Sequence, residues 1–129
     1  MNFSFKNEGT WFYFNEDDQS KGGIKVRITL EQDLDKIYKV TRKTVNKFKH
    51  GQRFEDVKID NAKEDRLIYD HCIVEWDNVT VDGKELECNA ENKYNLVKKS
   101  LSFRMFFNTC IETVTSDFDV LNEEEIAKN

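Results

Sequence analysis

The sequence contains no proline, only five glycines and three cysteines among its 129 residues. Without proline, tight turns depend on Gly, Asn and Asp. An odd number of cysteines without a CxxC spacing argues against a disulfide framework and favours reduced, mostly buried thiols. No apolar run approaches the roughly 18 residues of a membrane span, and the N-terminal residues lack the plan of a signal peptide. We therefore expect no membrane association and a protein that stays in the cytosol.

Patterns that carry catalysis or bind cofactors are also missing. The Lys-Gly-Gly sequence at 21–23 lacks the spacing of a phosphate-binding loop. The two histidines and three cysteines match no zinc finger, ribbon or knuckle, and they show no local signature of a Cys-His nucleophile. Paired carboxylates such as Asp17 and Asp18 fall in a polar segment, where a solubilising role is favoured over acid-base catalysis. We expect no metal, no cofactor and no enzymatic activity.

The composition is that of one small folded domain. Charged residues make up 35% and hydrophobic residues 38% of the chain, and ten Phe supply large apolar side chains for a core. We predict a single α+β domain over residues 1–115. Residues 116–129 are rich in Asp and Glu and are predicted to form an acidic, frayed C-terminal tail.

The first 28 residues favour antiparallel strands. Apolar and polar residues alternate around Phe3 and Phe5 and over 24–28, and residues 11–14 form an aromatic run. Two or three strands, with a loop at 15–23, are therefore predicted. A second short hairpin is predicted around Asp82-Gly83, because both residues tolerate the positive φ of a two-residue turn.

About four helices are predicted after the first strands. The longest begins at a capping box of Thr29 and Gln32, continues to His50 and ends at Gly51. A second helix, capped by Asp60, is expected to end near Trp76. The other two are a helix over 90–99 capped by Asn89 and a final helix capped by Ser100.

Two helical surfaces are candidate binding sites. On the final helix a broad apolar face is either core or a groove for a client helix, and its candidate client-binding residues are Phe103, Phe106, Phe107, Ile111 and Val114. On the long predicted helix Lys36, Lys39, Lys43 and Lys47 form a charged face. Although this stripe could grip phosphates, the net charge of −5 disfavours nucleic acid. A solvated face, or pairing with an acidic surface such as the tail of a neighbouring copy, is favoured.

The order of several short motifs resembles that of the tail assembly chaperones of prophages and tailed phages. The motifs are Trp11-Phe-Tyr-Phe14, Gly-Ile-Lys-Val-Arg ending at Arg27, Cys72-Ile-Val-Glu-Trp76, Val81-Asp-Gly-Lys84, Glu91-Asn-Lys93 and the terminal Lys128-Asn129.

The resemblance implies an assembly factor in the cytoplasm of a bacterial host. Such proteins bind the tape measure protein and tail tube subunits reversibly during virion assembly and leave the finished particle. The partners implied are therefore phage tail proteins, and a homo-oligomer is also possible. Two alternatives stay open: a structural component such as a tail terminator or head-tail joining protein, and a small DNA-binding regulator.

Overall fold

The computed structural model describes residues 2–118, 120 and 121. Side-chain caps fix the N-termini of three of its helices. Asp60 accepts a hydrogen bond from the Lys63 amide and begins α2 (Asn61–Cys72). Asn89 caps α3 (Ala90–Lys99), and Ser100 caps α4 (Leu101–Asp117). Together with α1 (Glu31–Thr41) and several small antiparallel sheets, these helices confirm the predicted α+β class.

A three-stranded antiparallel sheet forms the centre of the body. Its order is β2 (Thr10–Tyr13), β3 (Gly23–Val26) and β6 (Ile73–Asp77). A short 3₁₀ helix, η1 (Gln19–Lys21), lies in the loop between β2 and β3. The hairpin at Asp82-Gly83 is confirmed, with β7 (Thr80–Val81) paired to β8 (Lys84–Glu85). Near the N-terminus β1 (Asn2–Phe3) pairs with β9 (Val120–Leu121).

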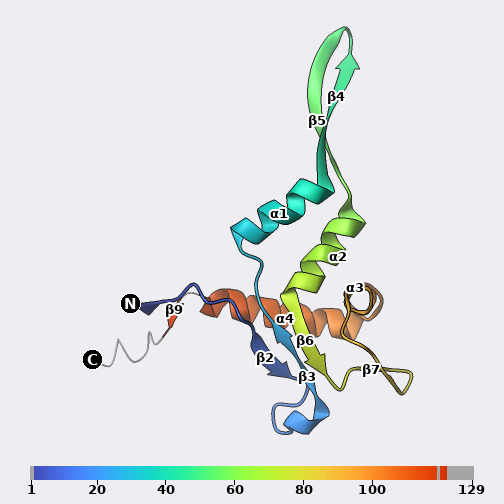
Figure 1. Ribbon diagram of the computed structural model, residues 1–129. Coiled ribbons are helices and arrows are strands. Elements are labelled where there is room, and N and C mark those ends of the chain that lie inside the picture. The colour runs from blue at the N-terminus through green and yellow to red at the C-terminus, as the bar shows by residue number, and fades with distance from the viewer. Residues whose placement is uncertain (1, 119, 122–129) are drawn as a thin grey trace.

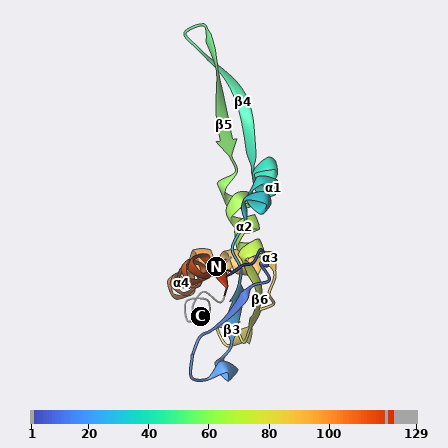
Figure 2. The same cartoon turned by 90° about the vertical axis from the view of Figure 1, so that its left-hand side faces the viewer.

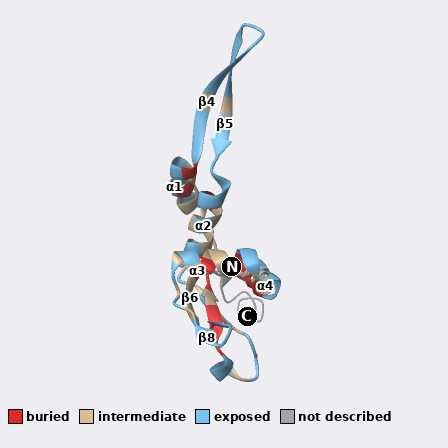
Figure 3. Cartoon of the chain, turned by 90° about the vertical axis from the view of Figure 1, so that its right-hand side faces the viewer, coloured by how far each residue is buried: buried red, intermediate tan, exposed pale blue. Residues whose placement is uncertain are grey.

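The core lies between this sheet and α4, as Figure 3 shows by the buried residues on β3 and along α4. The rings of Trp76 (β6) and Phe103 pack edge to face with their centres 6.3 Å apart. Those of Tyr69 (α2) and Phe107 pack in the same way, 5.9 Å apart. Helix α3 is held to α2 by Lys93, whose buried ammonium donates to Asp70 at 2.9 Å. Because buried aromatic pairs add to the energy of burial, these contacts fix α4 against the sheet.

The prediction of one helix from residue 29 to 50 is wrong. Helix α1 ends at Thr41, and the chain continues as β4 (Arg42–Lys49), which pairs over its whole length with β5 (Gln52–Ile59). His50 and Gly51 both have positive φ, 52° and 75°, and form a two-residue hairpin turn. The apolar spacing fitted a helix, but β-branched residues in both strands and this turn favour a hairpin.

Two other predicted boundaries are also corrected. Helix α2 ends at Cys72 rather than near Trp76, because Ile73 and the residues after it pair with β3. The expected capping box of Thr29 is absent: α1 begins after Leu30 without a side-chain cap, and the Thr29 hydroxyl lies 3.0 Å from Cys72 Sγ. Helix α4 continues through Asp117, into the predicted tail, while residues 122–129 lie outside the described residues.

The paired strands β4 and β5 project away from the body as an arm, which we define as residues 42–59 (Figures 1 and 2). Eight-residue strands span about 26 Å, and α1 and α2 carry the arm at their ends (Figure 1). Every residue of the arm except Val45 and Asp56 is exposed. A free two-stranded hairpin is marginally stable in water, so the arm depends on the contacts at its base to stay ordered.

Candidate functional site

A buried carboxylate at the base holds the arm to the helices. Glu64 of α2 is 9% exposed and accepts a hydrogen bond from Arg42 Nε at 2.8 Å, while the Thr41 hydroxyl lies 3.1 Å from the same carboxylate oxygen. The guanidinium of Arg42 also stacks 3.6 Å from the centre of the Tyr38 ring. The hydrogen bond from Arg42 lowers the pKa of Glu64 below its ordinary value. This cluster fixes where the arm leaves the body.

We expect the Glu64→Gln variant to lose about 1–2 kcal/mol of stability at neutral pH, since hydrogen bonds to charged groups are worth this much or more. Because the pKa of Glu64 is lowered in the folded protein, its contribution is present above the pKa of the unfolded chain. It disappears as the pH falls through the folded pKa. Urea unfolding of both proteins between pH 7 and pH 3 should show the difference closing at low pH. A difference independent of pH would contradict the assignment.

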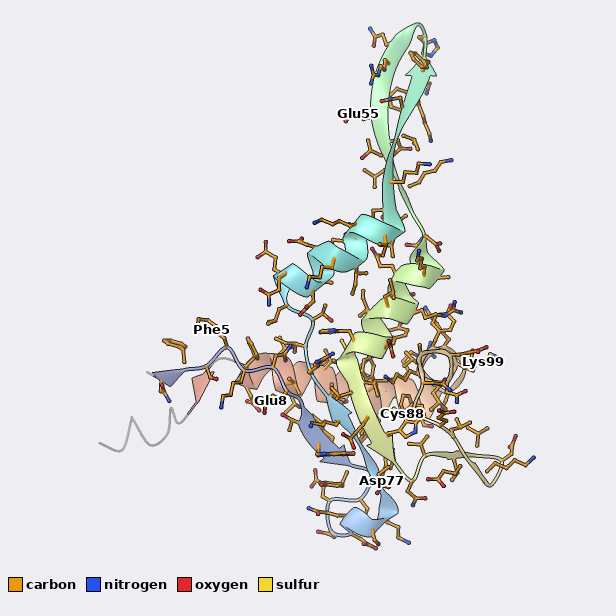
Figure 4. All side chains as sticks on the ribbon, viewed as in Figure 1. Phe5, Glu8, Glu55, Asp77, Cys88 and Lys99 are labelled. Atoms are coloured by element: carbon orange, nitrogen blue, oxygen red, sulfur yellow. The ribbon has the colours of Figure 1, made fainter. Side chains whose placement is uncertain are left out.

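The two faces of the arm have different chemistry. Residues directly opposite each other share a face, and the faces alternate along each strand. One face carries Phe48 near the tip, 75% exposed and directly opposite Arg53, and Val57 and Ile59 nearer the base. The other, the lysine face, carries Lys43 directly opposite Lys58, and further along it Lys47, Phe54 and Lys49. Side chains project from both sides of the arm in Figure 4.

The prediction of a single charged helix face is therefore wrong. Lys36 and Lys39 are exposed on α1, whereas Lys43 and Lys47 are exposed on β4, so the four do not line one helix. The structure instead brings Lys43 and Lys47 together with Lys58 and Lys49 on the lysine face of the arm. Lys47 bonds Asp56 at 2.8 Å, and the opposed pair of Lys43 and Lys58 is mutually repulsive.

An apolar groove of about 840 Å³ lies in the body, where the end of β2, the β6–β7 connection, the β7–β8 hairpin and the α3–α4 junction meet. We call it the groove. Phe14 and Phe106 contact each other in its wall, with ring centres 5.1 Å apart. Its apolar lining consists of Phe14, Val79, Val81, Leu86, Leu96, Phe103 and Phe106. A concave, mostly apolar surface of this size is suited to binding.

The five predicted client-binding residues of α4 have different positions. Phe103, Phe107 and Val114 are buried in the core, and Phe106 and Ile111 are half-buried against it. Only Phe103 and Phe106 line the groove. Most of the face is therefore core, and the surface open to a client is its N-terminal end. The groove residues on other elements carry no recognisable sequence signal, because they meet only in the folded chain.

The cysteines are free thiols with raised pKa values. Burial raises the pKa of Cys72 and Cys88 and raises that of Cys110 to about 11. Activation of a cysteine nucleophile requires the opposite shift. Among residues 2–118, 120 and 121, no group of three His, Cys, Asp or Glu side chains is arranged to hold a metal ion, and no helix is long and apolar enough to cross a membrane.

Comparison with protein-family models, with curated proteins and with solved structures finds no match for this chain.

Proposed function

We propose that the protein is a phage tail assembly chaperone that acts in the cytoplasm of a bacterial host. It binds an apolar helical segment of the tape measure protein in the groove, releases it during assembly, and also contacts tail tube subunits. The observation that carries the proposal is the groove itself, an apolar surface that three aromatic side chains line. Aromatic anchors and a hydrophobic channel are what helix-in-groove recognition requires. The order of the sequence motifs adds support.

A charge placed in the groove should abolish client binding without unfolding the protein. Val81 is 41% exposed and lines the groove, so Val81→Lys adds an ammonium where an apolar helix would have to desolvate it. We expect at least a tenfold loss of affinity, about 1.4 kcal/mol or more. The measurement is co-purification and titration with a tape measure protein of a tailed phage.

Val40→Lys is the matched control. Val40 is 56% exposed on α1, outside both the groove and the arm, so the same substitution there should leave client binding unchanged. Thermal unfolding verifies that both variants are folded. Equal binding by wild type and Val81→Lys, or no complex with any tail protein, would reject the proposed function.

A second candidate, a structural virion component such as a tail terminator or head-tail joining protein, is favoured by the projecting arm (Figure 2). Rings and tubes are built from contacts between different surfaces of successive subunits, and an arm provides such a surface. Mass spectrometry of purified particles separates the two candidates, since a virion component persists in the particle and a chaperone does not.

A further inference from the structure

The arm and the groove occupy opposite ends of an elongated molecule. The tip of the arm lies at one end in Figure 1, while the β7–β8 hairpin lies with the body at the other end. Figure 4 labels Glu55 on the arm and Asp77, next to the groove residue Asn78, far from it. The arm therefore lies away from the groove of its own chain. A second copy, however, can present its arm to this groove.

The charges of the two ends are opposite. Residues 42–59 include six Lys or Arg and two Asp or Glu, a net charge of +4, so the rest of the chain carries −9 of the total of −5. Residues 77–91, which contain the β7–β8 side of the groove, have five Asp or Glu and one Lys, although Lys99 also lines it. Opposite potentials steer surfaces together, and like potentials keep them apart. Two arms therefore repel each other, whereas an arm and a groove attract.

The arm also has features that an isolated hairpin does not explain. The lysine face holds one carboxylate, Asp56, for four lysines, and Asp56 bonds Lys47. Further acidic groups would stabilise the opposed pair of Lys43 and Lys58. Phe48 exposes three quarters of its surface near the tip, directly opposite Arg53. At the tip, Phe48 and Arg53 occupy one face, and Lys47 and Lys49 the other. Such a tip fits an apolar groove whose flanking residues are acidic, and Phe14, Phe103 and Phe106 provide aromatic partners there.

We infer that the tip of the arm of one copy inserts into the groove of a second copy, with Phe48 toward the aromatic residues on one wall and the lysine face, on the opposite side of the arm, toward the acidic 77–91 segment. The contact joins two different surfaces, so copies associate head to tail. This inference takes the groove of the proposed function as its acceptor: the arm covers the groove between clients, and a client helix displaces it.

Mixing two variants tests the contact. Phe48→Thr removes the ring and keeps β-propensity, and Val81→Lys adds a cation to the groove. Sedimentation velocity should show wild-type species that grow beyond dimers with concentration, and each variant alone should be a monomer. An equal mixture should form dimers and nothing larger, because one intact arm and one intact groove remain. Phe5→Thr, at an N-terminal residue that is 86% exposed, is the control and should associate like wild type.

Several results would overturn the inference. These are a wild-type protein that stays monomeric up to about 1 mM, self-association that persists in Phe48→Thr, and a mixture that forms no dimers. Another is retention of a monomeric wild-type protein on duplex DNA, with an affinity that falls steeply as salt is added. That result would make nucleic acid the partner of the arm. Client binding separates the two proposals: a wild-type protein that stays monomeric and binds the client leaves only the proposed function, and dimers in the mixture without client binding by Phe48→Thr leave only this inference.

Discussion

The Phe107→Ala variant is expected to lose about 3–5 kcal/mol of stability, the range measured when a buried Phe is truncated to Ala. Phe107 is 4% exposed, belongs to the main core cluster and meets Tyr69 edge to face. The cavity left by its ring would lie between α4 and α2. Since small domains have about 5–15 kcal/mol in total, a large part of the stability would disappear. Urea unfolding followed by circular dichroism measures the loss.

Phe106→Ala is the matched comparison on the same helix. Phe106 is half-buried and contacts Phe14 in the wall of the groove. Less buried area is lost, so we expect a cost of roughly half that of Phe107→Ala, together with weaker client binding. Equal losses of stability in the two variants, without a change in client binding, would show that Phe106 is core and not part of a binding surface.

The Gly22→Ala variant is expected to lose about 3 kcal/mol or more. Gly22 has φ 91° and ψ −179°, a region that is essentially restricted to glycine and costs other residues about 1–3 kcal/mol. A Cβ there would also collide with the carbonyl oxygen of Asp77 and lie 2.7 Å from Asn78 Cβ. Both atoms belong to the end of β6 and the residue that follows it, so the sheet itself would have to shift. Thermal and urea unfolding report the cost.

Gly83→Ala isolates the contribution of that collision. Gly83 also has positive φ, 79°, but an added Cβ would meet nothing within 4 Å. Only the left-handed conformation is then penalised, and the expected cost is about 1–2 kcal/mol. If Gly22→Ala were no more destabilising than Gly83→Ala, the close approach of the two chain segments at Gly22 would be contradicted.

Local signals predicted the elements whose ends depend on a single side chain or turn. Asn89, Ser100 and Asp60 bond the backbone amides that their positions suggested, and Asp82-Gly83 makes the predicted turn. These interactions join residues at most three apart, so tertiary packing has little influence on them. The α+β class and the pairing of β2 with β3 followed from the same kind of pattern.

The arm could not be predicted in the same way because its sequence fits two structures. Leu34, Ile37 and Val45 keep a helical spacing, and Gly51 fits a helix stop as well as a hairpin turn. The distinction depends on pairing with residues 52–59 and on the anchoring of Arg42 by Glu64, which is 22 positions away. Contacts of that separation leave no local signal in one sequence.

The candidate site was predicted only in part for a related reason. The apolar face of α4 was recognised, but a periodic pattern cannot separate buried positions such as Phe107 from those that line the groove, such as Phe106. The rest of the groove comes from Phe14 just after β2, from Val79 and Leu86 on either side of the β7–β8 hairpin, and from Leu96 of α3. Their proximity is a property of the tertiary structure.

Hydrogen exchange with and without a tape measure protein determines whether the groove binds a polypeptide. We expect slower exchange of the amides of residues 78–86 when the client is added, with faster exchange in residues 42–59 as the displaced arm returns to solvent. Unchanged exchange at 78–86 in the presence of a bound client would contradict it.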